Sequence, residues 1–242
     1  MAELKVTLKL LGFFILVSLS ASRVAPPPVP AWPDKFTINF DVLVEKYGDD
    51  WKSTGTLYYD YNIKTFRADY IDWCLPLFDD GSSDNNDYSC SFFATAEDMF
   101  FVNFTASSGK WEDYDCCLFE AGLAAVPPDW MKAEQYNGTD VINGISVDVW
   151  WFPGTSDPSK PCYGYWNAKD ELKTPVRFFG LSSLGPTILD YRDFEPQKIP
   201  QHIEMTKPND NCQKKCEPPL ADVLKKSAVD SVKWSKIDWP SC

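Results

Sequence analysis

Apolar and polar residues alternate with a period of two along the body of the chain. The first such stretch has an apolar side chain at every second position, at Phe36, Ile38, Phe40, Val42 and Val44. Alternation of this kind is typical of a β-strand that buries one of its faces. The segments 53–61 and 65–73 continue the pattern on either side of Asn62, and together they predict a hairpin.

Further short segments are rich in β-branched and aromatic residues and are separated by Gly, Pro or Asn. They predict strands at 91–95, 99–105, 114–119, 141–152, 162–167, 174–181 and 186–194. A short helix is expected at 129–136, and long helical periodicity is absent from this part of the sequence. The pattern therefore predicts a mainly β (α+β) fold with one large, curved antiparallel sheet.

The N-terminal segment differs in composition from this body. Residues 1–22 contain two lysines, then an apolar run that is too short to span a bilayer, and then small residues. We interpret 1–22 as a cleaved signal peptide, with an uncleaved anchor as the alternative. Residues 23–34 contain five prolines and predict an extended lead-in to a β domain over 35–204. No later stretch is apolar enough for a membrane helix, so no transmembrane segment is expected after signal cleavage.

The C-terminal segment 205–242 also stands apart. It carries 7 basic and 5 acidic residues, whereas 23–204 carries 14 basic and 29 acidic residues. Apolar residues at helical spacing predict a short helix over 220–234. We expect a cysteine-containing extension that disulfides fasten to the sheet, with this helix packed on the sheet. The alternative is a helix that binds a partner or acts on a membrane.

Eight cysteines follow the signal segment, an even number that is typical of disulfides in an exported chain. Adjacent Cys116 and Cys117 would point to opposite sides of a strand, so we expect them to have different partners. The connectivity stays open at this point. The spacing of Cys212 and Cys216 also fits a metal site, but the sequence has no matching second half-site. The cysteines are Cys74, Cys90, Cys116, Cys117, Cys162, Cys212, Cys216 and Cys242.

Two sequons allow N-glycosylation in the same compartment, at Asn103 and Asn137. Asn137-Gly138 is predicted to form a turn, which makes Asn137 the better candidate. The expected location is secreted or extracellular, or the lumen of the secretory pathway, a vacuole or a lysosome.

The net charge of −12 argues against nucleic acid and anionic membranes as partners. One acidic loop, between Cys74 and Cys90, offers several oxygen ligands that suit calcium. Its alternative is a solvated loop closed by a Cys74–Cys90 disulfide. Calcium is therefore a possible cofactor, and no other cofactor is expected. The candidate ligands are Asp79, Asp80, Asp84 and Asp87.

Catalytic motifs do not stand out in the sequence. His202 is the single histidine and has no evident nucleophile to activate. The sequence lacks a Gly-x-Ser-x-Gly elbow, a phosphate loop and a His-Glu-x-x-His motif. Asp113-Tyr114-Asp115 matches a short metal-binding motif that is frequent by chance, and a carboxylate pair of the glycosidase type stays open. We therefore expect a protein that is not an enzyme.

Aromatic residues occur in adjacent pairs within several predicted strands. An extended backbone places one ring of each pair on each face of the sheet. Either both faces are covered by protein, or some rings line a ligand cavity, and the sequence leaves both open. The candidate cavity residues are Tyr58, Tyr59, Phe100, Phe101, Trp150, Trp151, Phe178 and Phe179.

Short aromatic motifs recur along the chain, namely Gly55-x-x-Tyr58-Tyr59-Asp60, Arg67-x-Asp69-Tyr70, Asn143-Gly144, Val147-x-Val149-Trp150, Tyr165-Trp166, Pro175-Val176-Arg177 and Tyr191-x-Asp193-Phe194. These motifs resemble those of a largely uncharacterised family of small secreted plant proteins. Their order is also similar to that in the N-terminal domains of some papain-like proteases, and more distantly to ependymin-related proteins and bacterial periplasmic lipoprotein carriers.

The resemblance implies a strongly curved antiparallel sheet, an open half-barrel with helices over its concave face, which holds an apolar or lipid-like ligand. The leading hypothesis is a secreted, non-enzymatic glycoprotein that binds a small apolar ligand. The alternative is an acidic component of the extracellular matrix with weak calcium binding and protein partners, since ependymin-related proteins are associated with calcium and with the extracellular matrix. A carbohydrate-binding or carbohydrate-active protein is the second alternative.

Overall fold

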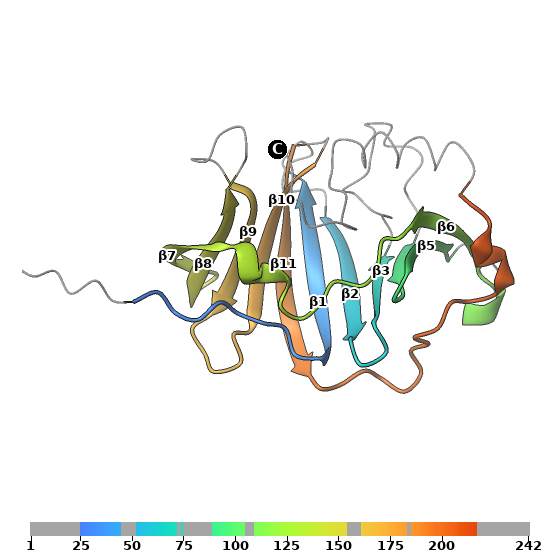
Figure 1. Ribbon diagram of the computed structural model, residues 1–242, viewed down its shortest axis with the longest axis horizontal. Coiled ribbons are helices and arrows are strands. Elements are labelled where there is room, and N and C mark those ends of the chain that lie inside the picture. Colours follow the sequence, from blue (N-terminus) through green and yellow to red (C-terminus); the bar gives the residue numbers. More distant parts are fainter. Residues whose placement is uncertain are drawn as a thin grey trace, which may run out of the picture.

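The computed structural model describes residues 25–44, 52–71, 74, 89–104, 109–153, 161–182 and 185–216. Within them, eleven antiparallel strands form a single sheet (Figure 1). The sheet is open because its two edge strands, β6 and β7, do not pair with each other. The predicted mainly β fold with an open half-barrel is thereby confirmed. The strands are β1 Lys35–Val44, β2 Lys52–Asp60, β3 Thr65–Ile71, β4 Cys90–Ala94, β5 Asp98–Asn103, β6 Asp115–Ala121, β7 Gln135–Ile142, β8 Ile145–Pro153, β9 Pro161–Ala168, β10 Pro175–Ser182 and β11 Gly185–Pro196.

The strand order explains the path of the chain. It is β6-β5-β4-β3-β2-β1-β11-β10-β9-β8-β7, so two meanders meet where β1 pairs with β11. The chain leaves β6 at one edge of the sheet and must begin β7 at the opposite edge. Residues 122–134, which we name the crossing segment, therefore run across the whole sheet (Figure 1).

The predicted strand over 141–152 was partly wrong: β8 accounts for 145–152, but a hairpin turn separates it from residues 141 and 142. Asn143 and Gly144 have φ values of 50° and 82° and close the turn between β7 and β8. Positive φ at both central positions is the requirement of a type I′ turn, and Asn-Gly meets it best. Val141 and Ile142 therefore end β7 rather than begin β8.

The prediction for residues 129–138 was partly wrong. A short 3-10 helix, η4, spans Trp130–Ala133, and β7 then begins at Gln135. Asn137-Gly138 is not a turn but a bulge within β7, where the pairing register shifts between Tyr136 and Thr139 and Gly138 has a φ of 93°. Most side chains of this edge strand are exposed, so its sequence lacks the apolar alternation that marks a half-buried strand.

One side of the sheet, which we name the apolar face, carries a continuous layer of buried side chains. On β1 it holds Phe36, Ile38, Phe40 and Val42, each 2% exposed or less. Partly buried Tyr191 packs against the clusters on both halves of the sheet and joins them. The layer continues across the other strands through Tyr59, Tyr70, Phe92, Phe101, Trp150 and Tyr165.

The opposite side, the polar face, changes character along the sheet. Near β1 it carries Asn39, Thr56, Asp41 and Asp190, which lie opposite one another in the strand pairing. At the β4–β6 end it is apolar and covered, with a separate buried cluster of Phe93, Phe100, Val102, Trp111 and Cys212. Both faces are thus covered at this end, which accounts for the adjacent aromatic pairs of β4 and β5.

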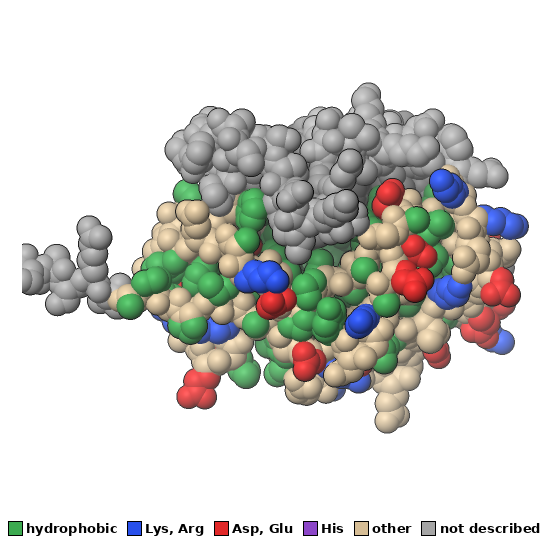
Figure 2. Space-filling view, in the orientation of Figure 1, with side chains coloured by type: hydrophobic (Ala, Val, Ile, Leu, Met, Phe, Trp, Pro, Cys, Tyr) green, Lys and Arg blue, Asp and Glu red, His purple; other side chains and the backbone are tan. Residues whose placement is uncertain are grey.

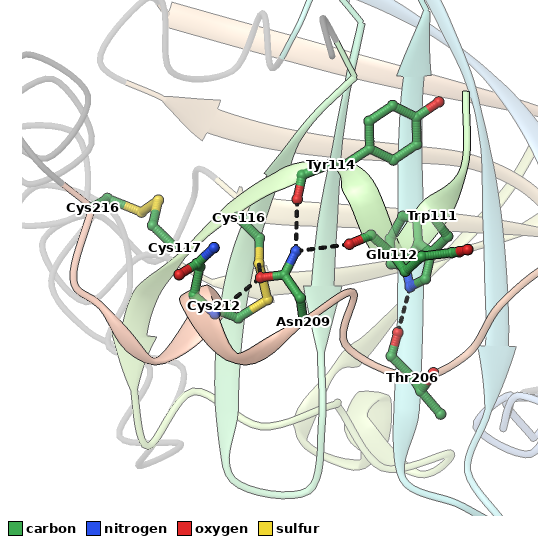
Figure 3. The surroundings of a disulfide bond; sticks show 10 residues. Trp111, Glu112, Tyr114, Cys116, Cys117, Thr206, Asn209, Cys212 and Cys216 are labelled. Atoms are coloured by element: carbon green, nitrogen blue, oxygen red, sulfur yellow. Dashed lines mark hydrogen bonds between the residues drawn. A yellow bond between two sulfur atoms is a disulfide. The ribbon is translucent and has the colours of Figure 1, made fainter. Parts of the chain in front are cut away.

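The covered end of the polar face is built by the C-terminal extension. Trp111 Nε1 donates to the Thr206 carbonyl at 2.6 Å (Figure 3). The Asn209 amide donates to the carbonyls of Glu112 and Tyr114 at 3.1 and 3.0 Å (Figure 3). The extension then reaches the 3-10 helix η5, Asp210–Gln213. These contacts fold residues 206–213 onto the sheet.

Two disulfides fasten the extension to β6. Cys116 is bonded to Cys212 and Cys117 to Cys216, so the neighbouring cysteines have different partners, as the alternation of a strand predicts (Figure 3). A third disulfide joins Cys74 and Cys90 across 16 residues. The stapled extension in the predicted fold is therefore confirmed.

Several predictions lie outside the described residues. They are the signal segment 1–22, the acidic loop with Asp79, Asp80, Asp84 and Asp87, the helix over 220–234, Cys242 and the side chain of Cys162. The resemblance also implied helices over the concave face. Within the described ranges the helices are 3-10 turns of three or four residues, η3 Trp111–Asp113, η4 and η5, and the crossing segment contains no other helix or strand.

Candidate ligand-binding face

The crossing segment covers part of the apolar face. Leu123 and Ala125 pack on the β3–β5 half, while Trp130 and Met131 pack on Trp150 and other residues of the β8–β9 half. Met131 is fully buried, and Leu123, Ala125, Trp130 and Trp150 are each less than 8% exposed. The segment and the face thus form two apolar layers in direct contact.

The lead-in also lies against this face (Figure 1). The Trp32 ring meets the rings of Phe36, Tyr59 and Trp130 edge-on, at centroid distances of 5.2, 5.3 and 5.4 Å. Its Nε1 donates to the Tyr165 hydroxyl at 3.2 Å. Trp32 is therefore a link between the sheet and the crossing segment. In Figure 2, hydrophobic side chains gather across the middle of the molecule in the region that these segments occupy.

Few hydrogen bonds tie the described crossing segment to the rest of the protein. Ala125 N donates to Thr95 O at 2.8 Å, and the Tyr59 hydroxyl donates to Val126 O at 2.8 Å. The Pro128 carbonyl accepts from Trp32 N at 3.0 Å. The remaining contacts described above are apolar, and these lack the directionality of hydrogen bonds.

Two polar atoms within these layers are buried without a hydrogen-bond partner. They are Oε2 of Glu134 and Nε1 of Trp130, and Glu134 as a whole is 8% exposed. By contrast, Trp150 Nε1 in the same cluster donates to Asn167 Oδ1 at 2.8 Å. A buried polar group without a partner costs roughly 1–3 kcal/mol. Such groups are uncommon in native structures, so these two require an explanation.

The protonation of Glu134 follows from its surroundings. Burial raises the pKa of its carboxyl from 4.5 to about 8, because the charged form loses its solvation. At neutral pH the carboxyl is therefore mostly protonated and can donate one hydrogen bond while it accepts others. Burial also raises the pKa of the neighbouring Tyr165 hydroxyl, which stays neutral.

The structure divides the predicted aromatic residues between the two faces. Tyr59, Phe101, Trp150 and Phe178 belong to the apolar face. Their sequence neighbours lie on the opposite side, where Phe100 belongs to the covered cluster. Gly164 pairs with Trp151 on one neighbouring strand and with Phe179 on the other, and the Trp166 ring lies against this glycine. The predicted set is therefore not one site. The residues on the opposite side are Tyr58, Phe100, Trp151 and Phe179.

The apolar layers contain residues that the sequence did not single out as candidate cavity residues, namely Trp32, Trp130, Glu134 and Tyr165. The one available signal is the run of apolar residues over 123–131, between two predicted strands. Its position over the sheet depends on the strand order, which the sequence does not reveal.

The polar face has a hollow of about 310 Å³ near β1 and β11. Salt bridges occupy its walls, since Arg192 Nη2 lies 3.3 Å from Asp41 Oδ1 and Arg177 binds both oxygens of Asp190. These groups already have partners, which favours a structural role. The hollow is lined by Asp41, Leu43, Asn143, Asp190, Tyr191 and Arg192.

Within the described ranges, no group of three His, Cys, Asp or Glu side chains is placed to hold a metal ion. Asp113 and Asp115, the short acidic motif, are both exposed, in η3 and at the start of β6. In the same ranges, no helix has the length and apolar character needed to cross a membrane.

No protein-family model matches this chain, and the search of curated proteins gave no significant match. Among solved structures, an uncharacterised conserved protein from Thermus thermophilus is 9% identical, with a TM-score of 0.46, over 76% of this chain and 91% of its own. The lipoprotein LppX of Mycobacterium tuberculosis is 12% identical, with a TM-score of 0.34, over 68% and 88%. A DUF1329 family protein from Desulfovibrio piger is 8% identical, with a TM-score of 0.27, over 68% and 86%.

LppX, a lipoprotein, and the DUF1329 family protein are thus distant structural neighbours of this chain. The resemblance to secreted plant proteins, papain-like proteases and ependymin-related proteins stays a prediction. At these TM-scores the likenesses carry no argument about function, and the proposal below rests on the geometry of the apolar face.

Proposed function

We propose that this protein binds a small apolar ligand with one hydrogen-bonding head group between the apolar face and the crossing segment. The observation that carries the proposal is the pair of buried, unpartnered groups on η4 and its C-terminal cap, Trp130 Nε1 and Glu134 Oε2. A ligand hydroxyl or carboxylic acid offers the donor and the acceptor that these two atoms lack.

The surroundings of the two groups favour an apolar ligand body. Trp130 meets the rings of Tyr165 and Phe178 at 5.8 and 6.3 Å, and Trp150 packs in the same cluster. An aromatic lining with few polar groups is typical of sites for small organic ligands. A cationic head group would require the ionised carboxyl that burial disfavours, and an anionic head group would be buried without an opposite charge, so a neutral head group fits best.

Ligand entry requires the crossing segment to move away from the sheet, since side chains fill the layer in this structure. The few hydrogen bonds that hold the segment make this motion less costly than the opening of strand pairs in the sheet. The ligand body would then lie between Trp130 and Met131 on one side and the β8–β9 half of the apolar face on the other.

We further propose that the protein is a secreted glycoprotein and not an enzyme. Three disulfides among the described residues support an oxidising compartment. The N-terminal signal pattern and the two sequons support secretion and glycosylation.

The test is a binding measurement on the full secreted protein. A naturally fluorescent sterol, whose head group is a single neutral hydroxyl, serves as the probe, and organic extraction followed by mass spectrometry identifies any copurified molecule. We expect saturable binding that falls about tenfold in Glu134→Leu, because the head group loses one hydrogen bond worth about 1.4 kcal/mol. Glu134→Gln keeps donor and acceptor and should retain most of the affinity.

Trp166→Phe is the matched control, since Trp166 lies on the polar face and its Nε1 is likewise buried without a partner. It should bind the probe as the wild-type protein does. Absence of binding and of any extractable molecule, or an equal loss in Trp166→Phe and Glu134→Leu, would overturn the proposal.

A further inference from the structure

The two edges of the open sheet are protected in different ways. At β6, the extension continues the hydrogen bonding: Leu118 N donates to Lys214 O at 2.7 Å and Cys216 N donates to Leu118 O at 3.1 Å. The adjacent disulfides hold this segment in place covalently. The β6 edge is therefore covered by the chain itself.

The β7 edge has no such cover among the described residues. β7 pairs with β8 alone, and no described backbone hydrogen bond reaches its outer side from another segment. Asn137, Thr139, Asp140 and Val141 are all exposed, and Val141 is 64% exposed. An exposed edge strand with an apolar residue is a template for pairing with another chain.

Two local features reduce this hazard without removing it. The bulge at Asn137-Gly138 interrupts the regular edge. Val141 lies next to the Ile142–Ile145 pair that closes the turn, so its N–H points outward, and Asp140 Oδ1 accepts from it at 2.7 Å. Among the described residues, the stretch around Asn137 still has no backbone hydrogen-bond partner on its outer side.

We propose that Asn137 carries an N-linked glycan that covers this edge and prevents strand addition by a second copy of the chain. Asn137-Gly138-Thr139 is a sequon, and its asparagine is exposed at the bulge. A bulky, hydrated glycan at this position would block the approach of another strand. The inference rests on the proposed secretion of the protein and is independent of ligand binding at the apolar face.

The chemistry is a group transfer in the secretory pathway. The donor is a lipid-diphosphate-linked oligosaccharide. The Asn137 amide nitrogen forms a bond to C1 of its first sugar, while the bond from C1 to the diphosphate oxygen breaks. The amide loses one proton, and the lipid diphosphate leaves with the electron pair of the broken bond. No oxidant or reductant takes part.

Asn103 provides a contrast. It lies in β5 between two paired strands, opposite Cys90 of β4 and Asp115 of β6. It is only partly exposed and takes part in a contact within the protein. A glycan there would have no open edge to cover.

The experiment uses the full chain, secreted from a eukaryotic cell line, with peptide mass mapping of both sequons. We expect a glycan on the Asn137 peptide in the wild-type protein, its loss in Thr139→Val, and its retention in Thr139→Ser, because serine preserves the sequon. Asn103→Gln should leave the Asn137 glycan in place. Secreted wild-type protein with an unmodified Asn137 would overturn the modification site.

The protective role is measured by size-exclusion chromatography with light scattering. We expect Thr139→Val to form dimers at concentrations at least tenfold below those at which Thr139→Ser does. Enzymatic trimming of the folded wild-type protein should have the same effect and does not depend on the folding of a variant. Adding Val141→Lys to Thr139→Val should restore the monomer, since an edge lysine opposes strand pairing. A trimmed protein that stays monomeric over the same range would overturn the protective role.

Discussion

The Arg67 guanidinium lies 3.8 Å from the centre of the Trp111 ring. Arg67 also makes three hydrogen bonds. Its Nε and Nη2 donate to the two carboxylate oxygens of Asp69 at 2.8 Å each, and its Nη1 donates to the Glu204 carbonyl at 3.1 Å. One side chain of β3 thus contacts η3 and the residue that directly precedes the C-terminal extension, on the polar face. The arrangement combines a planar bidentate salt bridge with stacking, which arginine provides and lysine does not.

Replacing Asp69 should be costly, because Arg67 would keep a buried charge without its carboxylate. We expect Asp69→Asn to lower the free energy of unfolding by about 3 kcal/mol in urea denaturation. The control is Asp129→Asn, whose partner Lys132 is 67% exposed, and which should change stability by less than about 0.5 kcal/mol. Losses of similar size in the two variants would contradict this interpretation of the Arg67 site.

The two neighbouring disulfides should stabilise the protein redundantly. Cys116–Cys212 and Cys117–Cys216 close loops of 96 and 99 residues, so either bond alone closes almost the same loop. We expect each Cys-to-Ser pair to lower the free energy of unfolding by about 2 kcal/mol or less, and the four-serine variant to lose about 4–5 kcal/mol. Urea denaturation of the three variants measures these losses. If one Cys-to-Ser pair costs as much as the four-serine variant, the two disulfides are not redundant, and the local packing around that one disulfide stabilises the protein rather than loop closure.

Two strand glycines should differ in their tolerance of a methyl group. A Cβ at Gly55 would lie 2.2 Å from the Asp69 carbonyl oxygen, whereas a Cβ at Gly164 would lie 2.6 Å from the ring of Trp166. Because a backbone atom moves less readily than a side-chain ring, we expect Gly55→Ala to cost about 3 kcal/mol and Gly164→Ala about 1 kcal/mol.

The double variant Gly164→Ala/Trp166→Ala checks the cause. Removal of the ring should make the added methyl group nearly neutral, as measured by a double-mutant cycle in urea. A Gly164→Ala cost that persists without the Trp166 ring would contradict the steric explanation.

The buried Glu134 carboxyl should make stability fall as the pH rises. Its pKa is about 8 in the folded protein and near 4.5 when exposed, so between these values the folded state keeps a proton that the unfolded chain has lost. The free energy of unfolding should therefore decrease by roughly a few kcal/mol between about pH 4.5 and about pH 8. Above pH 8, the contribution of Glu134 to stability should no longer change with pH. Glu134→Gln should remove this part of the slope.

Urea denaturation at several pH values between 5 and 9 measures the difference between the two proteins. The free energy of unfolding of Glu134→Gln should rise relative to that of the wild-type protein up to about pH 8, the pKa of the buried carboxyl. Parallel pH profiles would show that Glu134 is ionised within the folded protein or is exposed there.

Inner strands were predictable because they bury one face against a layer. The alternation from Phe36 to Val44 predicted β1, and the Asn62 turn predicted the β2–β3 hairpin, both of which the structure contains. The edge strand β7 was missed because most of its side chains are exposed, so no apolar period marks it. Local pattern therefore predicts a strand only where tertiary contacts bury one of its faces.

The candidate ligand-binding face was only partly predictable for a related reason. The sequence placed Tyr59, Trp150 and Phe178 in a candidate site, since an extended strand sends one ring of each pair to each face. It did not single out Trp130 or Glu134, because these lie in the crossing segment, whose position depends on which strands form the two edges.

The sequence by itself determined the extended character of the strands, the side to which each side chain points and the opposite directions of Cys116 and Cys117. These properties follow from backbone geometry over two or three residues. Only the tertiary structure decided which strand lies beside which, which cysteines meet and which polar atoms end up buried without partners. These outcomes depend on contacts between residues far apart in the chain, and on the path that a segment must take from β6 at one edge of the open sheet to β7 at the other.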